Sequence, residues 1–251
     1  MTVRELTIVP IREVPLIQQG DDLPSVLLRV LEESDFQPQP GDILVVTHSI
    51  VSIAEGCIFR KSDIEVSEEG KRIALLNNRT PEQVEVALRQ AKRVLRETPV
   101  LITETEHGLI TDYSGVDESN APPGTVMTLP ADPDKSALAI YRKLSDGLGF
   151  PIPVIISDTQ GRPWRKGAVN LAVGVAGFSP FAENEGKEDL YGRRLRSSLV
   201  CLADEIAAAA ELVMGQADEG VPLVIVRGIR FEGTDGSAAE IIRDAEQSLF
   251  D

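Results

Sequence analysis

The sequence predicts an α/β protein of mixed α+β type, and two features carry this prediction. Short apolar runs of strand length alternate with longer amphipathic segments along the whole chain of 251 residues, which is the pattern of sheets covered by helices. No internal repeat, low-complexity tract or long Gly-, Pro- or Ser-rich linker divides the chain. Residues 1–251 are therefore expected to form one functional unit.

The first elements follow from local apolar spacing. Residues 6–9 are typical of a strand, and residues 23–31 predict a helix with its apolar residues on one face and Asp21 and Asp22 near its start. The run Ile43–Thr47 is rich in β-branched residues and predicts a buried strand.

The middle of the chain predicts two helices around another strand. Residues 81–96 are charged and amphipathic, which favours a surface helix with Thr80 as its cap and Pro81 at its first position. Residues 100–103 predict a strand. A second helix is expected from Asp132, whose carboxylate would cap freed backbone amides, to residue 148.

The last part of the chain continues the alternation. Further strands are expected at residues 154–157, 171–175 and 223–226. An Ala-rich stretch predicts a long helix over residues 189–214, closed by Gly215, and residues 238–249 predict a final helix.

Composition excludes several classes of partner. A net charge of −15 repels nucleic acids and anionic membranes, so neither is expected to bind. Two distant cysteines do not make a disulfide framework, and the N-terminus lacks a signal-peptide pattern, so a cytoplasmic location is expected. With His48 and His107 as the only histidines, an imidazole-rich metal site cannot be built. Oxygen ligands that suit Mg²⁺ or Mn²⁺ are the available alternative.

The strongest local signal for chemistry is the segment 157–167. Asp158 and Thr159 directly follow an apolar strand, where open α/β sheets place ligand-binding groups, and both offer hard oxygen atoms. Arg162 and Arg165 concentrate positive charge in an acidic protein and suit phosphate or carboxylate. The structural alternative is a solvated loop in which Trp164 anchors the chain to the core.

Three other segments are weaker when each is taken alone. Residues 115–120 are either a polar turn or a site in which Asp117 binds metal and Asn120 contacts substrate. Residues 214–222 are either an ordinary helix exit or a loop that holds a nucleotide, with Gln216 as a metal ligand. Neither a Walker loop nor a G-x-G-x-x-G fingerprint occurs, and His48 is more often structural than catalytic.

Taken together, these segments resemble one family: the GTP-dependent γ-glutamyl ligases that add glutamate to the deazaflavin precursor of coenzyme F420. The resemblance covers nearly the whole chain, and its motifs are specific in combination. They are Val14–Ile17, Gly20–Leu23, Ser52–Gly56, His107–Leu109, Gly115–Asn120, Leu129–Asp134, Ser157–Thr159, Gly161–Arg165, Ala203–Glu205 and Glu211–Gly215.

The resemblance implies the family's own α/β fold, built as an intertwined homodimer, and its reaction. GTP would phosphorylate the terminal carboxylate of the deazaflavin precursor, and the amine of L-glutamate would attack the acyl phosphate to leave a γ-linked amide. Two divalent cations, Mg²⁺ or Mn²⁺, are implied; the sequence does not decide between them or show whether a monovalent cation assists.

The matching positions imply roles for individual residues. The implied metal ligands are Asp117, Asp158, Thr159 and Gln216. The implied GTP site is lined by Val14, Pro15, Leu16, Ile17, His48, Ser49, Asn120, Met214, Gly215, Ala217, Asp218, Glu219, Gly220 and Val221. Arg162 and Arg165 are, by our own inference, candidate catalytic clamps for an oxyanion or substrate.

One departure from the family pattern concerns nucleotide binding. Ile53 stands where the family has a lysine near the nucleotide phosphates, within Ser-Lys-Ala-Glu-Gly. Arg60 and Lys61 are nearby cations that could substitute. Two alternatives stay open: an acid–amine ligase with another acceptor, and a catalytically silent homologue that binds nucleotide and metal.

Overall fold

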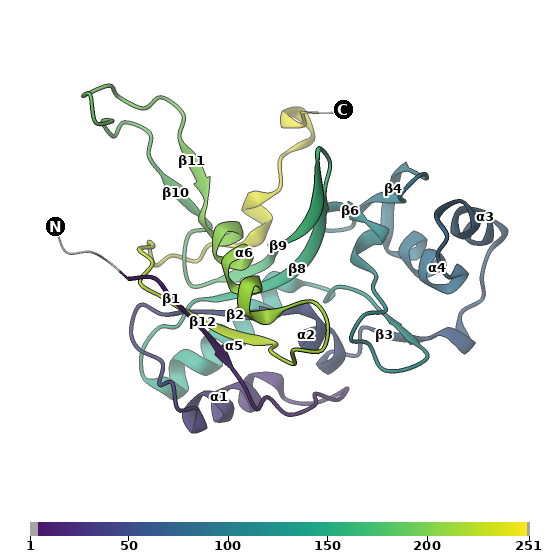
Figure 1. The fold of residues 1–251 in the computed structure, drawn as a ribbon, viewed down its shortest axis with the longest axis horizontal. Helices are drawn as coiled ribbons and strands as arrows, with labels where there is room; N and C mark the ends of the chain where they lie inside the picture. The colour runs from purple at the N-terminus through teal and green to yellow at the C-terminus, as the bar shows by residue number, and fades with distance from the viewer. Residues whose placement is uncertain (1–4, 250–251) are drawn as a thin grey trace.

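The main body of the protein is a mixed sheet with helices on both faces (Figure 1). The structure is a computed structural model, and it describes residues 5–249. Its sheet has the order β1-β12-β2-β8-β9. These strands are β1 (Thr7–Ile11), β12 (Leu223–Arg227), β2 (Ile43–Thr47), β8 (Val154–Arg162) and β9 (Arg165–Ala176). Only β2 and β8 pair in parallel within this sheet; the other neighbours are antiparallel.

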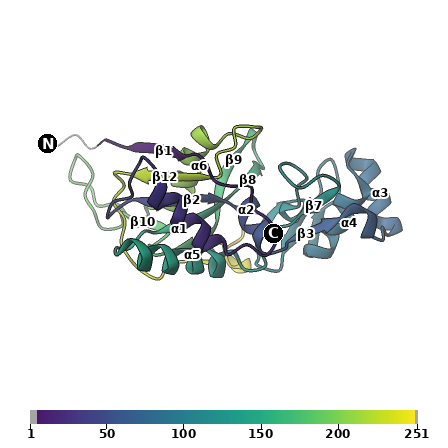
Figure 2. The ribbon, with the colours of Figure 1, turned by 90° about the horizontal axis from the view of Figure 1, so that it is seen from below.

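The helices form two layers around this sheet, which Figure 2 shows edge-on. Helices α1 (Leu23–Glu33) and α5 (Pro133–Leu148) cover one face, and α6 (Leu202–Met214) covers the other. Strand β2 alternates accordingly: Leu44 and Val46 pack toward α1 and α5, whereas Ile43 and Val45 pack toward α6. A strand buried on both faces needs a continuous apolar run, which this segment has.

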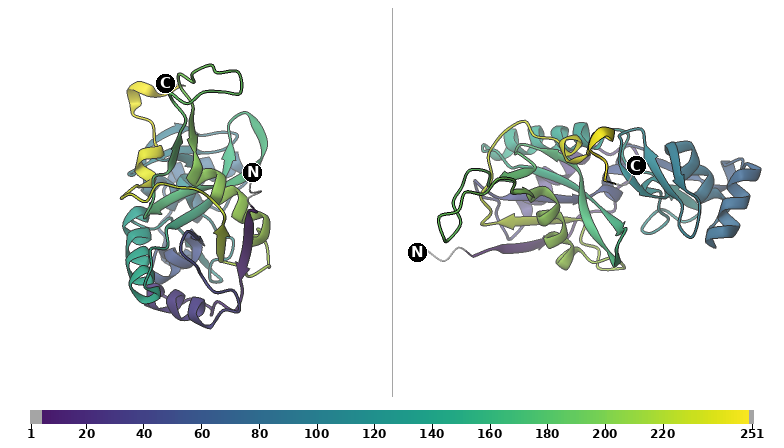
Figure 3. Two further views of the ribbon diagram at one scale, coloured as in Figure 1. Left: turned by 90° about the vertical axis from the view of Figure 1, so that its left-hand side faces the viewer. Right: turned by 90° about the horizontal axis from the view of Figure 1, so that it is seen from above.

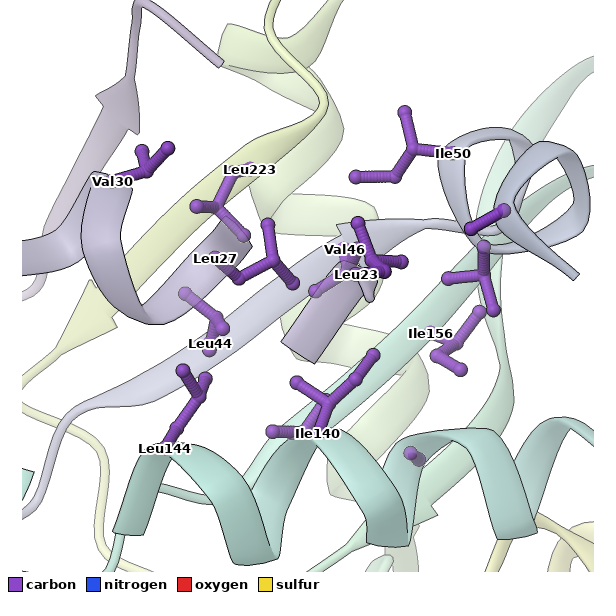
Figure 4. Packing of buried hydrophobic residues seen from close by; sticks show 14 of the residues in the cluster. Leu23, Leu27, Val30, Leu44, Val46, Ile50, Ile140, Leu144, Ile156 and Leu223 are labelled. Atoms are coloured by element: carbon purple, nitrogen blue, oxygen red, sulfur yellow. The ribbon is translucent and has the colours of Figure 1, made fainter. Parts of the chain in front are cut away.

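The larger core lies between the sheet and the α1–α5 layer. Leu27 of α1, Ile140 and Leu144 of α5, and Leu44 of β2 interdigitate there (Figure 4), and each is at most 2% exposed. Asp22 begins α1 by accepting a hydrogen bond from the Ser25 backbone N–H. These contacts hold β2 and β8 firmly, so the residues at their carboxyl ends are well positioned.

A smaller unit lies at one end of the elongated molecule (Figure 3). It contains the sheet β4-β5-β6, two helices and the ribbon β3-β7 around a core that includes Ile73, Val84 and Leu101. Its elements are β3 (Ile58–Arg60), α3 (Glu68–Asn77), α4 (Pro81–Gln90), β4 (Ala91–Arg96), β5 (Ile102–Thr105), β6 (Ile110–Asp112) and β7 (Thr125–Met127). Two 3-10 turns also belong to it, η1 (Lys61–Asp63) and η2 (Tyr113–Gly115).

Two projections leave the main body in Figure 1. The hairpin of β8 and β9 extends beyond the sheet, and an arm runs through β10 (Phe181–Glu183) and β11 (Leu199–Cys201). At the far end of the arm, Leu190 is 100% and Tyr191 is 95% exposed. Among residues 5–249, every helix is too short or too polar to cross a bilayer.

The mixed α/β class is confirmed, but three predicted helices are wrong in whole or part. The helix expected at residues 81–96 ends at Gln90, and residues 91–96 form β4 instead. Pairing with β5 overrides their helical pattern, and Lys92 and Arg93 bind Glu104 across the two strands.

The helix expected at residues 189–214 begins only at Leu202. Gly192, at φ +76°, and the Asp189 carboxylate, which accepts from the Tyr191 and Arg193 backbone N–H groups, form a turn at the end of the arm. The final helix expected at residues 238–249 is reduced to the 3-10 turns η3 (Ala238–Ile241) and η4 (Ala245–Gln247). There Asp134 accepts from the backbone N–H groups of residues 238 and 239, which fixes the segment by tertiary contacts.

Candidate functional site

A polar cavity of about 250 Å³ opens where the main sheet meets the smaller unit. The carboxyl end of β2 brings Thr47 to it, and the end of the parallel pairing between β2 and β8 brings Ser157 and Asp158, as expected for a ligand site in an α/β sheet. The other walls come from the start of α2 (His48–Ala54), from β6 and η2, from residues 115–120, and from the exit of α6.

Asp158 lies deepest among the acids of this cavity. It is 9% exposed, and its Oδ1 lies 3.3 Å from His48 Nε2. Burial raises the pKa of Asp158, the charge of Asp112 raises it further, and His48 and the Thr159 backbone N–H oppose the rise. A carboxylate in this setting gains most from a nearby cation.

Thr159 links β8 to the loop after α6. Its hydroxyl donates to Asn170 Oδ1 at 2.6 Å and accepts from Gln216 Nε2 at 2.7 Å. Gly215 has φ +73° and ψ 179°, a backbone conformation essentially restricted to glycine, so this residue allows the sharp turn after α6. Gln216 reaches the cavity because of this tight turn.

Asp117 and Asn120 enter the cavity from the segment before β7. The Asp117 backbone pairs with Met127, and its Oδ1 accepts from the Glu118 backbone N–H at 2.7 Å and from the Ser119 hydroxyl at 3.2 Å. Both readings of this segment therefore apply: it is a polar turn, and it presents Asp117 and Asn120 to the cavity.

The neighbouring Glu118 fixes this turn to the rest of the smaller unit. Its carboxylate accepts from Lys61 Nζ at 2.7 Å and from the Thr80 hydroxyl at 2.5 Å. Burial raises the pKa of Glu118, but the bonds from Lys61 and Thr80 outweigh burial and lower it. Lys61 is thereby engaged away from the cavity lining.

Sequence reasoning missed several residues of this cavity. Arg79, directly before α4, is a cation in its lining, and its guanidinium lies 5.2 Å from the ring centre of Tyr113. Asp112, Gln83 and Asn170 also line the cavity. Gln83 lies in α4, Asp112 in β6 and Asn170 in β9. With Arg79 of the loop before α4 they form no motif, so only the tertiary structure brings these residues together.

The donor set fits a divalent cation bound through oxygen. Within residues 5–249, no three His, Cys, Asp or Glu side chains lie close enough to hold a metal by themselves. The cavity does gather Asp112, Asp117 and Asp158 with the Thr159 hydroxyl and the Gln216 amide. Carboxylate, hydroxyl and amide oxygens are ligands for Mg²⁺ and Mn²⁺, which bind through few carboxylates and complete their shell with water or phosphate.

The structure brings some of the predicted nucleotide-binding residues together and leaves others outside. Cavity-lining residues among them are His48, Ser49, Asn120, Met214 and Gly215. The cavity lining does not include Val14, Pro15, Leu16, Ile17, Ala217, Asp218, Glu219, Gly220 or Val221. Ile53, at the lysine position of the family, is 8% exposed and packs in the main core.

The predicted clamps lie on the β8–β9 hairpin. The strand that was expected to end at Ser157 continues to Arg162, so Asp158 is part of a strand rather than an exit loop. Arg162 lies four residues further on, about 13 Å along the strand, and donates to the Lys166 and Gly167 carbonyls. Arg165 is exposed. Trp164 is 78% exposed and is not a core anchor.

Comparison with known proteins shows the family to which this chain belongs. The family model described as F420-0:Gamma-glutamyl ligase matches residues 12–228. The chain is similar to the Coenzyme F420:L-glutamate ligase of Methanothermobacter thermautotrophicus, with 43% identity over 98% of both chains. It is also similar to the proteins of the same name from Methanopyrus kandleri, with 44% identity over 96% of both, and Archaeoglobus fulgidus, with 38% identity over 96% of this chain and 94% of that one. The chain therefore belongs to the F420-0:gamma-glutamyl ligase family.

Proposed function

We propose that the protein is a GTP-dependent ligase that forms a γ-glutamyl amide between L-glutamate and the carboxylate of the deazaflavin precursor of coenzyme F420. The observation that carries this proposal is the oxygen-rich cavity of Asp117, Asp158, Thr159 and Gln216 in a chain of this family. All three substrates are anions, and a protein with a net charge of −15 needs local positive charge to hold them.

The reaction begins when a carboxylate oxygen of the acceptor attacks the γ-phosphorus of GTP, and GDP leaves. The amine of L-glutamate then attacks the carbonyl carbon of the acyl phosphate and loses a proton, and inorganic phosphate leaves. Asp117, Asp158, Thr159 and Gln216 would hold two divalent cations, Mg²⁺ or Mn²⁺. Bound there, such cations neutralise charge on the transferring phosphoryl group.

Residues of this chain position the nucleotide around that centre. Asn120, His48 and Ser49 present hydrogen-bonding groups in the cavity. The His48 ring lies between Asp158 and Ser52. Its Nε2 faces the Asp158 carboxylate, and its Nδ1 lies 3.4 Å from the Ser52 hydroxyl, so the orientation of the ring is restrained. We extend the nucleotide site to the segment 217–221, which directly follows Gln216 in the chain, and, on the family resemblance, to the segment 14–17.

Arg79 is our candidate for the positive charge that Ile53 does not supply. It lines the cavity, whereas Lys61 is held by Glu118 and Ile53 is buried in the core. A guanidinium stacked on Tyr113 keeps its donors available for phosphate oxygens.

Arg162 and Arg165 remain predicted clamps for an anionic substrate. Their hairpin projects from the main body, so they would meet a substrate that approaches from outside the cavity (Figure 1). Such peripheral charges are expected to raise the association rate or the affinity of the substrate rather than the rate of the chemical step.

We propose in addition that the active form is the intertwined homodimer. The arm between Phe181 and Cys201 extends away from the body and carries the exposed side chains Leu190 and Tyr191 at its end. An exposed leucine and tyrosine on a projecting arm match a contact with a second copy.

A panel of acceptors tests the activity. GDP release would be measured with GTP, L-glutamate and Mn²⁺ while the acceptor is varied between the deazaflavin precursor and other carboxylic acids. Release with the deazaflavin precursor is expected. Release only with other acids would identify a different acid–amine ligase, and tight GTP and Mn²⁺ binding without release from any acid would identify a silent homologue.

A further inference from the structure

A second cavity, of about 300 Å³, lies beside the polar one and differs from it in character. Most of its wall is apolar and comes from the turn before β6, from residues 129–134 at the start of α5, from β9 and from the C-terminal segment. Its main apolar contributors are Leu109, Leu129, Leu171, Val173, Ile241 and Ile242. Its volume lies at the lower end of the roughly 300–1,000 Å³ typical of sites that enclose a small molecule.

The two cavities share structural elements. On β9, Asn170 lines the polar cavity and Leu171 lines the apolar one, from opposite faces of the strand. Leu109 faces the apolar cavity, and Thr111, two residues later, faces the polar one. Asp158 pairs with Leu171 in the β8–β9 register. Directly paired residues of an antiparallel sheet point to the same face with Cβ atoms about 4.5–5.5 Å apart, so a chain that passes Leu171 reaches Asp158 in the wall of the polar cavity.

The acids of the apolar cavity are already engaged by the protein. Asp204 accepts from the Ala172 backbone N–H at 2.9 Å. Asp134 accepts from the backbone N–H groups of Val175 at 2.8 Å and Ala238 at 2.7 Å. Those bonds fix the wall. Its lining contains no lysine or arginine, and its histidine, His107, donates from Nε2 to the Ala131 carbonyl, which argues against a phosphate here.

One polar group of the wall is unused. Thr105 is 5% exposed, and its hydroxyl has no hydrogen-bond partner among the described residues. A buried hydroxyl without a partner is uncommon, and it offers a bond to a ligand that is apolar on its faces and polar at its edge. A flat heteroaromatic ring has that distribution.

We propose that the apolar cavity binds the deazaflavin ring of the acceptor, while the carboxylate arm passes Leu171 and Asp158 into the polar cavity. This inference rests on the proposed function, since it names where that acceptor lies. It also gives a role to residues 238–242, which lie beyond the family match at residues 12–228 and close one wall. The guanine base of GTP is the competing flat ring.

Ile242→Glu tests the proposal by placing a charge in the apolar wall. The fluorescence of the deazaflavin precursor would report its binding, and GTP binding with Mn²⁺ would be measured separately. We expect the Kd of the deazaflavin precursor to rise by roughly tenfold or more, because the new carboxylate would be desolvated against the ring. GTP affinity should stay within about twofold. Leu249→Glu, 69% exposed in the same C-terminal region, is the matched control and should change neither.

Leu109→Ala keeps the test decisive if Ile242→Glu does not fold. This smaller change should weaken binding of the deazaflavin precursor by about tenfold through lost apolar contact. Unchanged deazaflavin binding in a folded variant would overturn the proposal, and loss of GTP binding alone would assign the cavity to guanine. If the wild-type protein ligates glutamate and the variants bind normally, only this inference fails. If the wild type binds no deazaflavin, the proposed function fails with it.

Discussion

At Asp158 the requirements of folding stability and of the proposed metal binding conflict. Its carboxylate is 9% exposed beside Asp112, where burial and the neighbouring charge both disfavour ionisation. A protein selected for stability alone would place a neutral side chain there. An unfavourable buried charge of this kind is expected at functional sites, where a bound cation offsets it.

Replacing Asp158 separates these two roles. Asp158→Asn should keep the fold and its stability at pH 7, because the amide removes a buried charge without changing the shape. Its affinity for Mn²⁺ should fall by at least about tenfold, since a charged ligand is lost. Calorimetric titration with Mn²⁺ and chemical denaturation measure the two effects. Asp146→Asn, exposed on α5, is the control, and equal Mn²⁺ affinity in the Asp158 variant would contradict the metal assignment.

Arg79 gives a second test at this scale. Arg79→Gln should raise the KM for GTP by about tenfold or more, because one charge-assisted hydrogen bond contributes about 1.5–3 kcal/mol. Arg142→Gln, on the exposed side of α5, removes the same charge far from the cavity lining and should leave KM nearly unchanged. An equal rise in the KM for GTP in both variants would show that net charge, rather than a contact with phosphate, causes the effect.

The sequence could predict the cavity residues that sit in motifs, but not their partners. Asp117, Asp158, Thr159 and Gln216 were expected together, and all four line one cavity. Arg79 was not expected, because an arginine before a helix has no local pattern that distinguishes a site from a solvated surface. Only the packing of the smaller unit against the β2 and β8 ends reveals it.

At the scale of elements, the contact between α3 and α4 depends on one buried carboxylate. Glu85 of α4 accepts from the Ser67 backbone N–H at 3.0 Å and from its hydroxyl at 2.6 Å, at the start of α3. Arg89 adds a bond at 3.0 Å. Burial raises the pKa of Glu85, but the bonds from Ser67 and Arg89 outweigh burial and hold that pKa below its ordinary value.

This lowered pKa predicts a pH dependence of stability. Because the folded pKa is below the unfolded one, Glu85 stabilises the fold at pH values above the unfolded pKa of about 4.3. The stabilisation is lost as the pH falls through the folded pKa. Glu85→Gln should therefore lower the free energy of unfolding by about 2 kcal/mol at pH 7 and much less at pH 3. Urea denaturation across this range measures it; an equal loss at both pH values would contradict the assignment.

Element prediction succeeded where local pattern and tertiary pairing agree. Ile43–Thr47 is a strand with the predicted bounds, and Asp132 caps α5 by accepting from the Lys135 backbone N–H at 3.0 Å. It failed at residues 91–96, which pair with β5, and at residues 189–201, where the turn at Asp189 and the pairing of β11 with β10 decide the conformation. Local spacing cannot supply that information.

At the scale of the whole molecule, the arm from Phe181 to Cys201 bears on assembly. If it exchanges with a second copy, the protein should elute at twice the chain mass of 27.2 kDa. Replacing both Leu190 and Tyr191 by Ser should shift the mass measured by light scattering toward the monomer. Leu75→Ser, 85% exposed on α3, is the control and should leave the mass unchanged. A monomeric wild-type protein would contradict the proposed dimer.

The whole protein is expected to join glutamate to the deazaflavin precursor in its polar cavity at the expense of GTP. The most direct measurement is mass spectrometry of the products after incubation with GTP, L-glutamate, Mn²⁺ or Mg²⁺ and the unglutamylated precursor. We expect a product heavier by a glutamyl residue, with GDP formed in equal amount, from wild type and Asp146→Asn but not from Asp158→Asn. No product from a wild-type protein that binds GTP and Mn²⁺ would contradict it, as would undiminished product from Asp158→Asn.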